Sequence, residues 1–174
     1  RITLDAYYID KFEVTNAQYS AYAEATSRPP AGSTWFPIYG GDNQPVVYVT
    51  WKNALEYCQW AGLRLPTEAE WEKAARGTDG REYPWGNDPP TFELANMGRE
   101  ECGTAPGSAC SYYGDSSDGY YHTAPVDSYP KGVSPYGVYN MSGNVTELVF
   151  DWYAGPLQEE YNPKGPIPGS EPIA

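Results

Sequence analysis

Apolar residues recur at helical spacing in three short stretches of the first half of the chain, and a threonine precedes each stretch. The first apolar face has the spacing i, i+3, i+4 and consists of Tyr19, Tyr22 and Ala23. Gln18 lies three residues after Thr15. This is the spacing of a capping box, in which each side chain bonds to the backbone N–H of the other residue. A helix is therefore predicted to begin after Thr15 and to end before the prolines at 29 and 30.

The same signals predict a second and a third helix. Residues 51–61 follow Thr50, and their apolar face consists of Ala54, Leu55 and Cys58. Thr67 and Glu70 have the spacing of another capping box, and a threonine cap contributes about 1 kcal/mol. Each helix should end at a glycine, because glycine adopts the left-handed backbone without strain. These glycines are Gly62 and Gly77.

Alternation of apolar and polar residues predicts several short strands. They are residues 2–14, which would hold one or two strands, Val46–Val49, Ala124–Tyr129, Gly137–Tyr139 and Thr146–Trp152. No helical periodicity follows Thr78, and residues 155–174 have the composition of a loop. The predicted fold class is α+β, as one irregular domain over residues 1–174.

The composition and charge of the chain argue against some classes of function. The chain has 17 Tyr and 6 Trp, whose polar tips suit a core in contact with loops, and its 18 Gly and 17 Pro indicate long irregular connections. The net charge of −12 would repel nucleic-acid phosphates. No apolar run is long enough to span a membrane. Acidic loops can instead bind cations.

The three cysteines divide into two kinds. Cys58 lies in the second predicted helix and is expected to be a small buried apolar residue. Cys102 and Cys110 flank a loop that contains Gly and Pro, so they form either a disulfide or two reduced thiols. A disulfide would indicate an oxidising, extracytoplasmic compartment. Without it the compartment stays unknown.

Four segments resemble one known family. They are Tyr8–Asn16, Pro45–Glu72 with its run Arg64-Leu65-Pro66-Thr67-Glu68-Ala69-Glu70-Trp71-Glu72, Tyr83–Gly86 and Gly137–Glu147. On these motifs the chain is similar to the formylglycine-generating enzyme / sulfatase-modifying factor family. The resemblance implies a C-type-lectin-like α+β fold with little regular secondary structure. It also implies a domain that is incomplete at both ends, in which residues 155–174 form a loop before missing C-terminal strands.

Calcium is the first cofactor that the resemblance implies. In the loop at residues 140–147, called the late loop below, Asn140 and Glu147 would supply side-chain oxygens, and Gly143 and Val145 would supply carbonyls. Calcium prefers hard oxygens of these kinds, and a glycine lets the backbone turn its carbonyls inward. From the residues alone, the loop could also be an ordinary Asn/Gly turn with a surface glutamate. Asn140 and Asn144 match the N-glycosylation pattern as well, but the ion loop would use the same residues.

A second calcium site is implied at Asn96-Met97 and Asp118-Gly119-Tyr120. Asn96 and Asp118 would supply side chains, and Met97 and Tyr120 would supply carbonyls. The other interpretation is a solvated acidic turn. Both calcium sites would be structural, since they would fix loops that have too little apolar surface to fix themselves.

Copper is implied only for the complete enzyme. The family uses oxygen and a copper ion bound by two cysteines to convert a sulfatase cysteine to formylglycine, and thiolates suit Cu(I). Neither the Arg-Gly-Gly-Ser-Trp-like pattern nor the Gly-Phe-Arg pattern of that segment occurs here, and none of the three cysteines lies at a catalytic position. Thr146 and Leu148 also stand where active members usually have tryptophan.

Two other polar groups have simpler interpretations. His122 is the only histidine, whereas a non-haem iron site needs several, so we expect a structural or surface histidine. Glu68, Glu70 and Glu72 are expected to serve helix capping and a solvated helix face rather than acid catalysis.

Two functions therefore stay open. The chain is either part of an oxidase that modifies a sulfatase-type protein or peptide, here without the catalytic cysteine pair, or a non-catalytic calcium-braced binding or scaffold module. The second would hold a peptide or glycan in an aromatic-lined groove, a role that the resemblance attributes to cell-surface and kinase-fused relatives. The sequence does not decide whether the chain is an enzyme, which ligand it binds or how it oligomerises.

Overall fold

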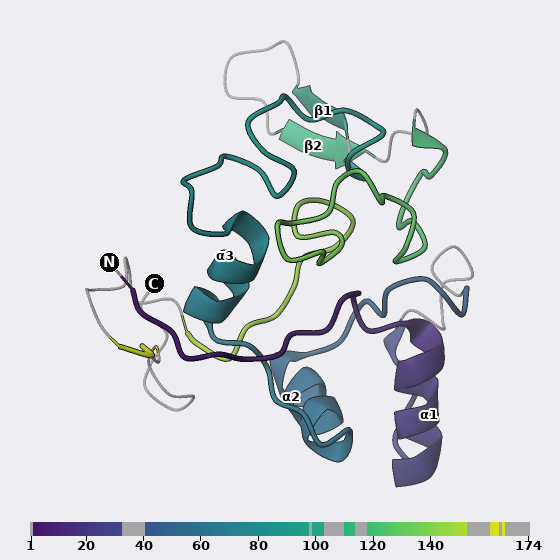
Figure 1. Ribbon diagram of the computed structural model, residues 1–174. Helices are drawn as coiled ribbons and strands as arrows, with labels where there is room; N and C mark the ends of the chain where they lie inside the picture. The colour runs from purple at the N-terminus through teal and green to yellow at the C-terminus, as the bar shows by residue number, and fades with distance from the viewer. Residues whose placement is uncertain are drawn as a thin grey trace.

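The computed structural model describes residues 2–32, 41–97, 99–102, 110–113, 118–152, 161–163 and 165. Within these residues the helices are α1 (Asn16–Thr26), α2 (Trp51–Trp60) and α3 (Glu68–Arg76), and the strands are β1 (Arg99–Cys102) and β2 (Cys110–Tyr113). The prediction of little regular secondary structure is confirmed (Figure 1). No helix in the described part of the chain is long and apolar enough to cross a bilayer.

The three predicted helices are confirmed, together with the threonine that caps each of them. Thr15 and Thr67 form complete capping boxes with Gln18 and Glu70, and Thr50 accepts a hydrogen bond from the backbone N–H of Asn53. All of these contacts join residues three positions apart. The sequence could predict the helices because their signals are local.

The predicted strands are wrong. Residues 2–14, Val46–Val49, Ala124–Tyr129, Gly137–Tyr139 and Thr146–Trp152 form no strand. Where bridges occur in these segments, they are isolated single pairs between described residues, such as Thr3 with Tyr161. A strand needs a partner in register, and the alternation within one segment does not reveal whether such a partner exists.

An antiparallel hairpin, β1–β2, is the one ladder among the described residues, and the sequence patterns did not predict it. Its register places Arg99 opposite Tyr113 and Cys102 opposite Cys110. The Cα atoms of residues opposed in this way lie about 4.5–5.5 Å apart, a separation that a disulfide can span. The backbone therefore suits the Cys102–Cys110 disulfide, which stays a prediction.

The apolar core is divided into two clusters. The α1/α2 cluster joins the first two helices and consists of Tyr19, Tyr22, Ala31 and Tyr57. The α3 cluster joins the third helix to the late loop and consists of Ala74, Ala75, Val138 and Met141. Val14 packs against the first cluster, and Ile9 packs against the second.

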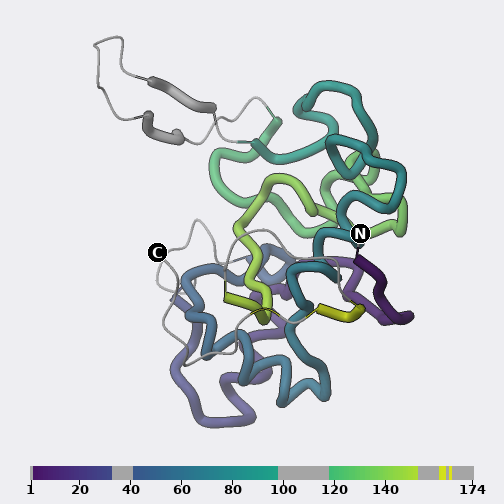
Figure 2. Tube along the Cα trace, turned by 90° about the vertical axis from the view of Figure 1, so that its left-hand side faces the viewer, coloured from purple at the N-terminus to yellow at the C-terminus, as the bar shows by residue number. Residues whose placement is uncertain are grey.

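The N-terminal segment passes between the two halves of the molecule. Figure 1 shows it crossing with α1 and α2 on one side and α3 with the hairpin on the other. Figure 2, turned by 90°, keeps α1 and α2 at one end and the loops that follow α3 at the other. A second connection runs near residue 150, where the Phe150 N–H donates to the Pro66 carbonyl at 2.8 Å. Trp51 Nε1 donates to the Val149 carbonyl at the same distance.

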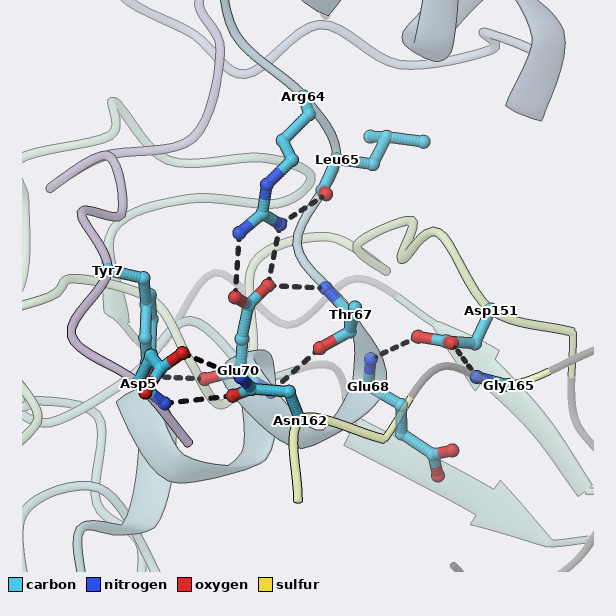
Figure 3. A network of polar contacts seen from close by, with 10 residues as sticks. All are labelled: Asp5, Tyr7, Arg64, Leu65, Thr67, Glu68, Glu70, Asp151, Asn162 and Gly165. Atoms are coloured by element: carbon cyan, nitrogen blue, oxygen red, sulfur yellow. Dashed lines mark hydrogen bonds and ion pairs between the residues drawn. The ribbon is translucent and has the colours of Figure 1, made fainter. Parts of the chain in front are cut away.

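A polar network fixes the start of α3 (Figure 3). The Arg64 guanidinium donates to both carboxylate oxygens of Glu70, each at 2.7 Å. The Thr67 N–H donates to the same carboxylate at 2.9 Å. These bonds, led by Arg64, lower the pKa of Glu70 although burial opposes the shift. The interpretation of Glu70 as a capping residue is confirmed.

The same network ties α3 to distant parts of the chain. Tyr7 donates its hydroxyl to the Glu70 carbonyl at 2.7 Å. Asp151 accepts from the Glu68 N–H at 2.6 Å, so a carboxylate lies at the positive end of the helix dipole. Glu72 instead makes an exposed ion pair with Arg76 at 3.1 Å, as a solvated helix face should. The contacts of Glu70 and Glu72 are thus the capping and surface contacts that the sequence predicts.

Candidate metal centre

The late loop curls tightly around its glycine. Asn140 (φ 54°), Gly143 (φ 100°) and Asn144 (φ 61°) all have positive φ, a region that asparagine tolerates better than most residues. A Cβ atom at Gly143 would lie 2.5 Å from the carbonyl oxygen of Asn96. The loop thus places its backbone directly against the segment that carries the second predicted site.

Asn140 is buried, and its amide group faces two acceptors. Nδ2 donates to a Glu13 carboxylate oxygen at 2.7 Å and to the Val126 carbonyl at 2.9 Å. Its amide oxygen receives no hydrogen bond from a described residue and can therefore act as a ligand. Since Nδ2 is engaged on both sides, the structure gives no support to glycosylation at this asparagine.

Asn144 joins the two predicted calcium sites. Its Nδ2 donates to the Glu13 carboxylate at 2.9 and 3.2 Å, and its Oδ1 accepts from Asn96 Nδ2 at 3.1 Å and from the Ala124 N–H at 2.8 Å. Its backbone N–H donates to the Asn96 carbonyl at 2.9 Å. Asn96 also donates to the His122 carbonyl at 2.7 Å, which leaves its own amide oxygen without a described donor. The backbone carbonyl of His122 thereby belongs to this polar network.

Glu147 lies on the α3 side of this loop. Trp71 Nε1 donates to one of its carboxylate oxygens at 2.5 Å. Burial raises the pKa of Glu147, and the Trp71 hydrogen bond opposes that change only in part. The side chain predicted as a calcium ligand is therefore held away from bulk water by the helix that the Arg64–Glu72 motif builds.

Glu13 is a second carboxylate in this region. Burial raises its pKa to about 7 against the hydrogen bonds from Asn140 and Asn144, and the charge of Glu147 raises it further. None of the ion pairs between described residues involves Glu13 or Glu147. The two buried carboxylates thus have no cationic side chain as a partner among the described residues, and burial favours their protonated forms unless a cation compensates their charge.

The backbone oxygens that the sequence motifs point to are also available. The carbonyls of Met97, Tyr120, Gly143 and Val145 accept no backbone hydrogen bond from a described residue. Among the residues that the structure describes, no group of three or more His, Cys, Asp or Glu could hold a metal. A calcium site of the predicted kind draws most of its ligands from amide and carbonyl oxygens, as this region offers.

Asp118 and Tyr120 form a local turn next to this network. The Tyr120 N–H donates to one Asp118 carboxylate oxygen at 2.9 Å, and the Tyr129 hydroxyl donates to the other at 2.8 Å. Asp118 is thereby oriented, and each of its oxygens keeps a lone pair for a further ligand. The described hydrogen bonds join Asn96 to the late loop through Asn144, and none of them joins Asn96 to Asp118.

The sequence patterns did not point to Glu13. They also did not predict that Asn144 would hydrogen-bond to the residues expected to bind calcium. The alternation of residues gave no signal for Glu13, because Lys11 lies on the same face of an extended segment as Ile9 and Glu13 and is exposed. Asn140, the partner of Glu13, lies 127 positions away, so the pairing itself could not be inferred.

The described thiol does not suit copper. Cys58 lies half-buried in α2. Burial raises the pKa of its thiol, so the thiolate that binds Cu(I) is disfavoured there. Cys102 and Cys110 occupy opposed positions of the hairpin backbone.

The family assignment follows from comparison with known proteins. The family model described as "Sulfatase-modifying factor enzyme 1-like domain" matches residues 1–165. The chain belongs to this formylglycine-generating enzyme family. The resemblance stated from the sequence motifs is thus confirmed.

Three relatives show how varied the family is. Mouse formylglycine-generating enzyme is 33% identical over 99% of this chain and 57% of its own length. The bovine protein named inactive C-alpha-formylglycine-generating enzyme 2 is 41% identical over 66% of the chain and 35% of its own length. Hercynine oxygenase of Mycolicibacterium thermoresistibile is 38% identical over 75% of the chain and 24% of its own length. The chain thus spans little more than half of the mouse enzyme, and membership of the family does not fix one reaction.

Proposed function

We propose that this chain is the calcium-braced framework of a formylglycine-generating-type domain with a C-type-lectin-like α+β fold. The observation that carries the proposal is the pair Glu13 and Glu147, two carboxylates in one amide-lined region that have no cationic side chain among the described residues as a partner. A divalent cation neutralises such a pair and uses the open carbonyls beside it.

The ligands are assigned by their chemistry. Asn140 and Glu147 supply side-chain oxygens to one ion, and Gly143 and Val145 supply carbonyls. Asn96 and Asp118 supply side chains to a second ion, with the carbonyls of Met97 and Tyr120. Glu13 holds Asn140 and Asn144 by accepting from their Nδ2 groups, so that the Asn140 amide oxygen is free to turn toward the ion. Calcium supplies charge neutralisation and cross-linking of loops, not catalysis.

Calcium binding is tested by thermal unfolding and isothermal titration of the chain after treatment with a chelator. At a calcium concentration about 100 times the dissociation constant, linkage adds about 2.7 kcal/mol. For a domain of this size, that raises the melting temperature by about 5 °C or more. Glu147→Gln keeps the shape of the side chain but removes a charge, and should reduce this rise by at least half.

Glu24→Gln is the matched control, since Glu24 is exposed on α1 and lies in none of the described ion pairs. This variant should keep the full response to calcium. Magnesium at equal concentration controls for ionic strength, because it demands a smaller octahedral site. An unchanged melting temperature in calcium, or an equal response in the two glutamate variants, would count against the proposal.

Oxidation of a sulfatase cysteine is a separate matter from calcium binding. Conversion of a cysteine in a sulfatase-type polypeptide requires a pair of thiolates for copper, and we propose that the described residues of this chain do not supply it. The chain alone then acts as a non-catalytic module, in keeping with an inactive relative at 41% identity. Incubation with copper, oxygen and a cysteine peptide from a sulfatase should leave the peptide mass unchanged. Formylglycine in the peptide would overturn this assignment.

A further inference from the structure

A cavity of about 590 Å³ lies where the N-terminal segment meets α3 and the turn that follows the α3 cluster in sequence. Its lining comes from residues 5–9 and Lys11, from Lys73 and Ala74 of α3, and from residues 136–138. Small-molecule pockets occupy about 300–1,000 Å³, so the volume suits a small ligand. None of the proposed calcium ligands lines this cavity.

The walls of this cavity are fixed by contacts within the protein. Ile9 packs against the α3 cluster, to which Ala74 and Val138 belong. On the opposite wall, the Ser134 hydroxyl accepts hydrogen bonds from the N–H groups of Tyr136 and Val138, each at 3.3 Å. A ligand would therefore meet walls that are already ordered, which lowers the entropy cost of binding.

The lining of the cavity is positively charged, although the protein is strongly acidic. Its charged residues are Lys11, Lys73 and Asp5, so its formal charge is +1 (two lysines less one aspartate), whereas that of the chain is −12. None of the ion pairs between described residues uses either lysine. The Asp5 carboxylate accepts from the Tyr161 hydroxyl and from Asn162 Nδ2, the latter at 2.8 Å (Figure 3). The two ammonium groups are thus left to bind an anion.

Aromatic rings lie beside these lysines. Lys11 Nζ is 5.1 Å from the ring centroid of Phe12 and 5.3 Å from that of Tyr139. These cation–π contacts position the ammonium group, which keeps N–H donors for a further partner. In the cavity lining itself, Tyr8 is fully exposed and Tyr136 is 56% exposed. Exposed rings of this kind can pack against a ring of a ligand in an offset or edge-on arrangement.

We propose that this cavity binds a small organic anion in which an aromatic ring carries a doubly charged group such as phosphate. The anionic group accepts hydrogen bonds from the ammonium groups of Lys11 and Lys73, which match its two charges. The ring packs against Tyr8 and Tyr136. Charge complementarity favours the anion, and the volume favours a small molecule over a folded partner.

An NMR titration of the ¹⁵N-labelled chain with phenyl phosphate at neutral pH tests this inference. The amide signals of Tyr8, Lys73 and Gly137 should shift and saturate with a dissociation constant at or below about 1 mM, whereas those of α1 should stay in place. Methyl phosphate, which has no ring, and phenol, which has no charge, should each bind at least about tenfold more weakly. Calcium is kept constant, so this titration and the calcium titration can fail separately.

Paired variants locate the ligand in the cavity. Lys11→Gln and Lys73→Gln should each weaken the binding of phenyl phosphate about tenfold, because each removes a charge-assisted hydrogen bond. Lys52→Gln is the matched control, since Lys52 is exposed, lies in none of the described ion pairs and does not line the cavity. Tyr136→Ala should weaken binding severalfold, whereas Tyr121→Ala, at a 54% exposed position outside the cavity, should not.

Four results would overturn the inference. The first is the absence of a saturable shift of these amides at millimolar phenyl phosphate, and the second is equal affinity for phenyl phosphate and methyl phosphate. The third is an equal loss of affinity in the Lys52→Gln and Lys73→Gln variants. The fourth is tighter binding of a glutamate-rich peptide than of phenyl phosphate, which would make the cavity a site for an acidic polypeptide.

Discussion

Position 143 shows how one residue limits the geometry of the late loop. Gly143 combines φ of 100° with a Cβ position 2.5 Å from the Asn96 carbonyl oxygen and 3.2 Å from the Ala95 Cβ. A side chain there would be strained by its own backbone and would also push the late loop away from the Ala95–Asn96 segment. Glycine is therefore required at this position for two reasons: its backbone adopts positive φ without strain, and it has no Cβ atom to clash with the Asn96 carbonyl.

Gly143→Ala should destabilise the protein by about 3 kcal/mol, measured by urea unfolding. Gly80→Ala is the control, since Gly80 also has positive φ (79°) but a methyl group added there would meet no atom within 4 Å. It should cost about 1 kcal/mol, the conformational part alone. Equal costs at the two positions would show that the Asn96 contact does not constrain the loop.

Glu70 gives a pH-dependent prediction. Its folded pKa lies below its ordinary value, chiefly because Arg64 donates to its carboxylate. A lowered folded pKa adds stability that is present above the unfolded pKa, near 4.5, and that is lost as the pH falls through the folded pKa. Glu70→Gln should therefore be less stable than the wild type at neutral pH, and the difference should shrink as the medium becomes more acidic.

Glu72→Gln serves as the comparison for that experiment. It removes an exposed ion pair with Arg76 on the same helix, worth only a few tenths of a kcal/mol. Its unfolding free energy at neutral pH should lie within about 0.5 kcal/mol of that of the wild type. A Glu70→Gln difference that stays constant as the medium becomes more acidic would contradict the role given to Arg64.

At the scale of elements, the helices could be predicted and the strands could not. A cap is decided by residues three positions apart, as with Thr67 and Glu70, so the sequence contains all of its signal. The segment at 2–14 alternates like a strand, yet most of its backbone has no partner among the described residues. The hairpin β1–β2 was missed because Arg99–Cys102 and Cys110–Tyr113 have only four residues each and do not alternate between apolar and polar residues.

The cap of α3 should contribute more than an average helix cap. Thr67 is buried, and its partner Glu70 also holds Arg64. Thr67→Ala should cost about 1–2 kcal/mol of unfolding free energy, whereas Thr78→Ala, at an exposed position just after α3, should cost less than about 0.5 kcal/mol. Similar losses in both variants, measured by chemical denaturation, would contradict the importance given to this cap.

At the scale of the whole molecule, polar contacts join parts of the chain that the apolar core, divided into two clusters, does not join. Glu13 joins the N-terminal segment to the late loop, and Trp71 joins α3 to Glu147. The candidate site could be predicted in part, since Asn140 and Glu147 belong to one short motif. The joining of that motif to Asn96 through Asn144 spans 48 positions, and only the folded chain brings them together.

The proposed framework depends most on a cation bound between the late loop and the buried carboxylates. A crystal grown in calcium and measured at a wavelength that reveals calcium by anomalous scattering tests this directly. We expect a peak about 2.3–2.6 Å from the amide oxygen of Asn140 and a carboxylate oxygen of Glu147. A map without a peak there, with the Glu147 carboxylate still bonded only to Trp71, would contradict the calcium assignment.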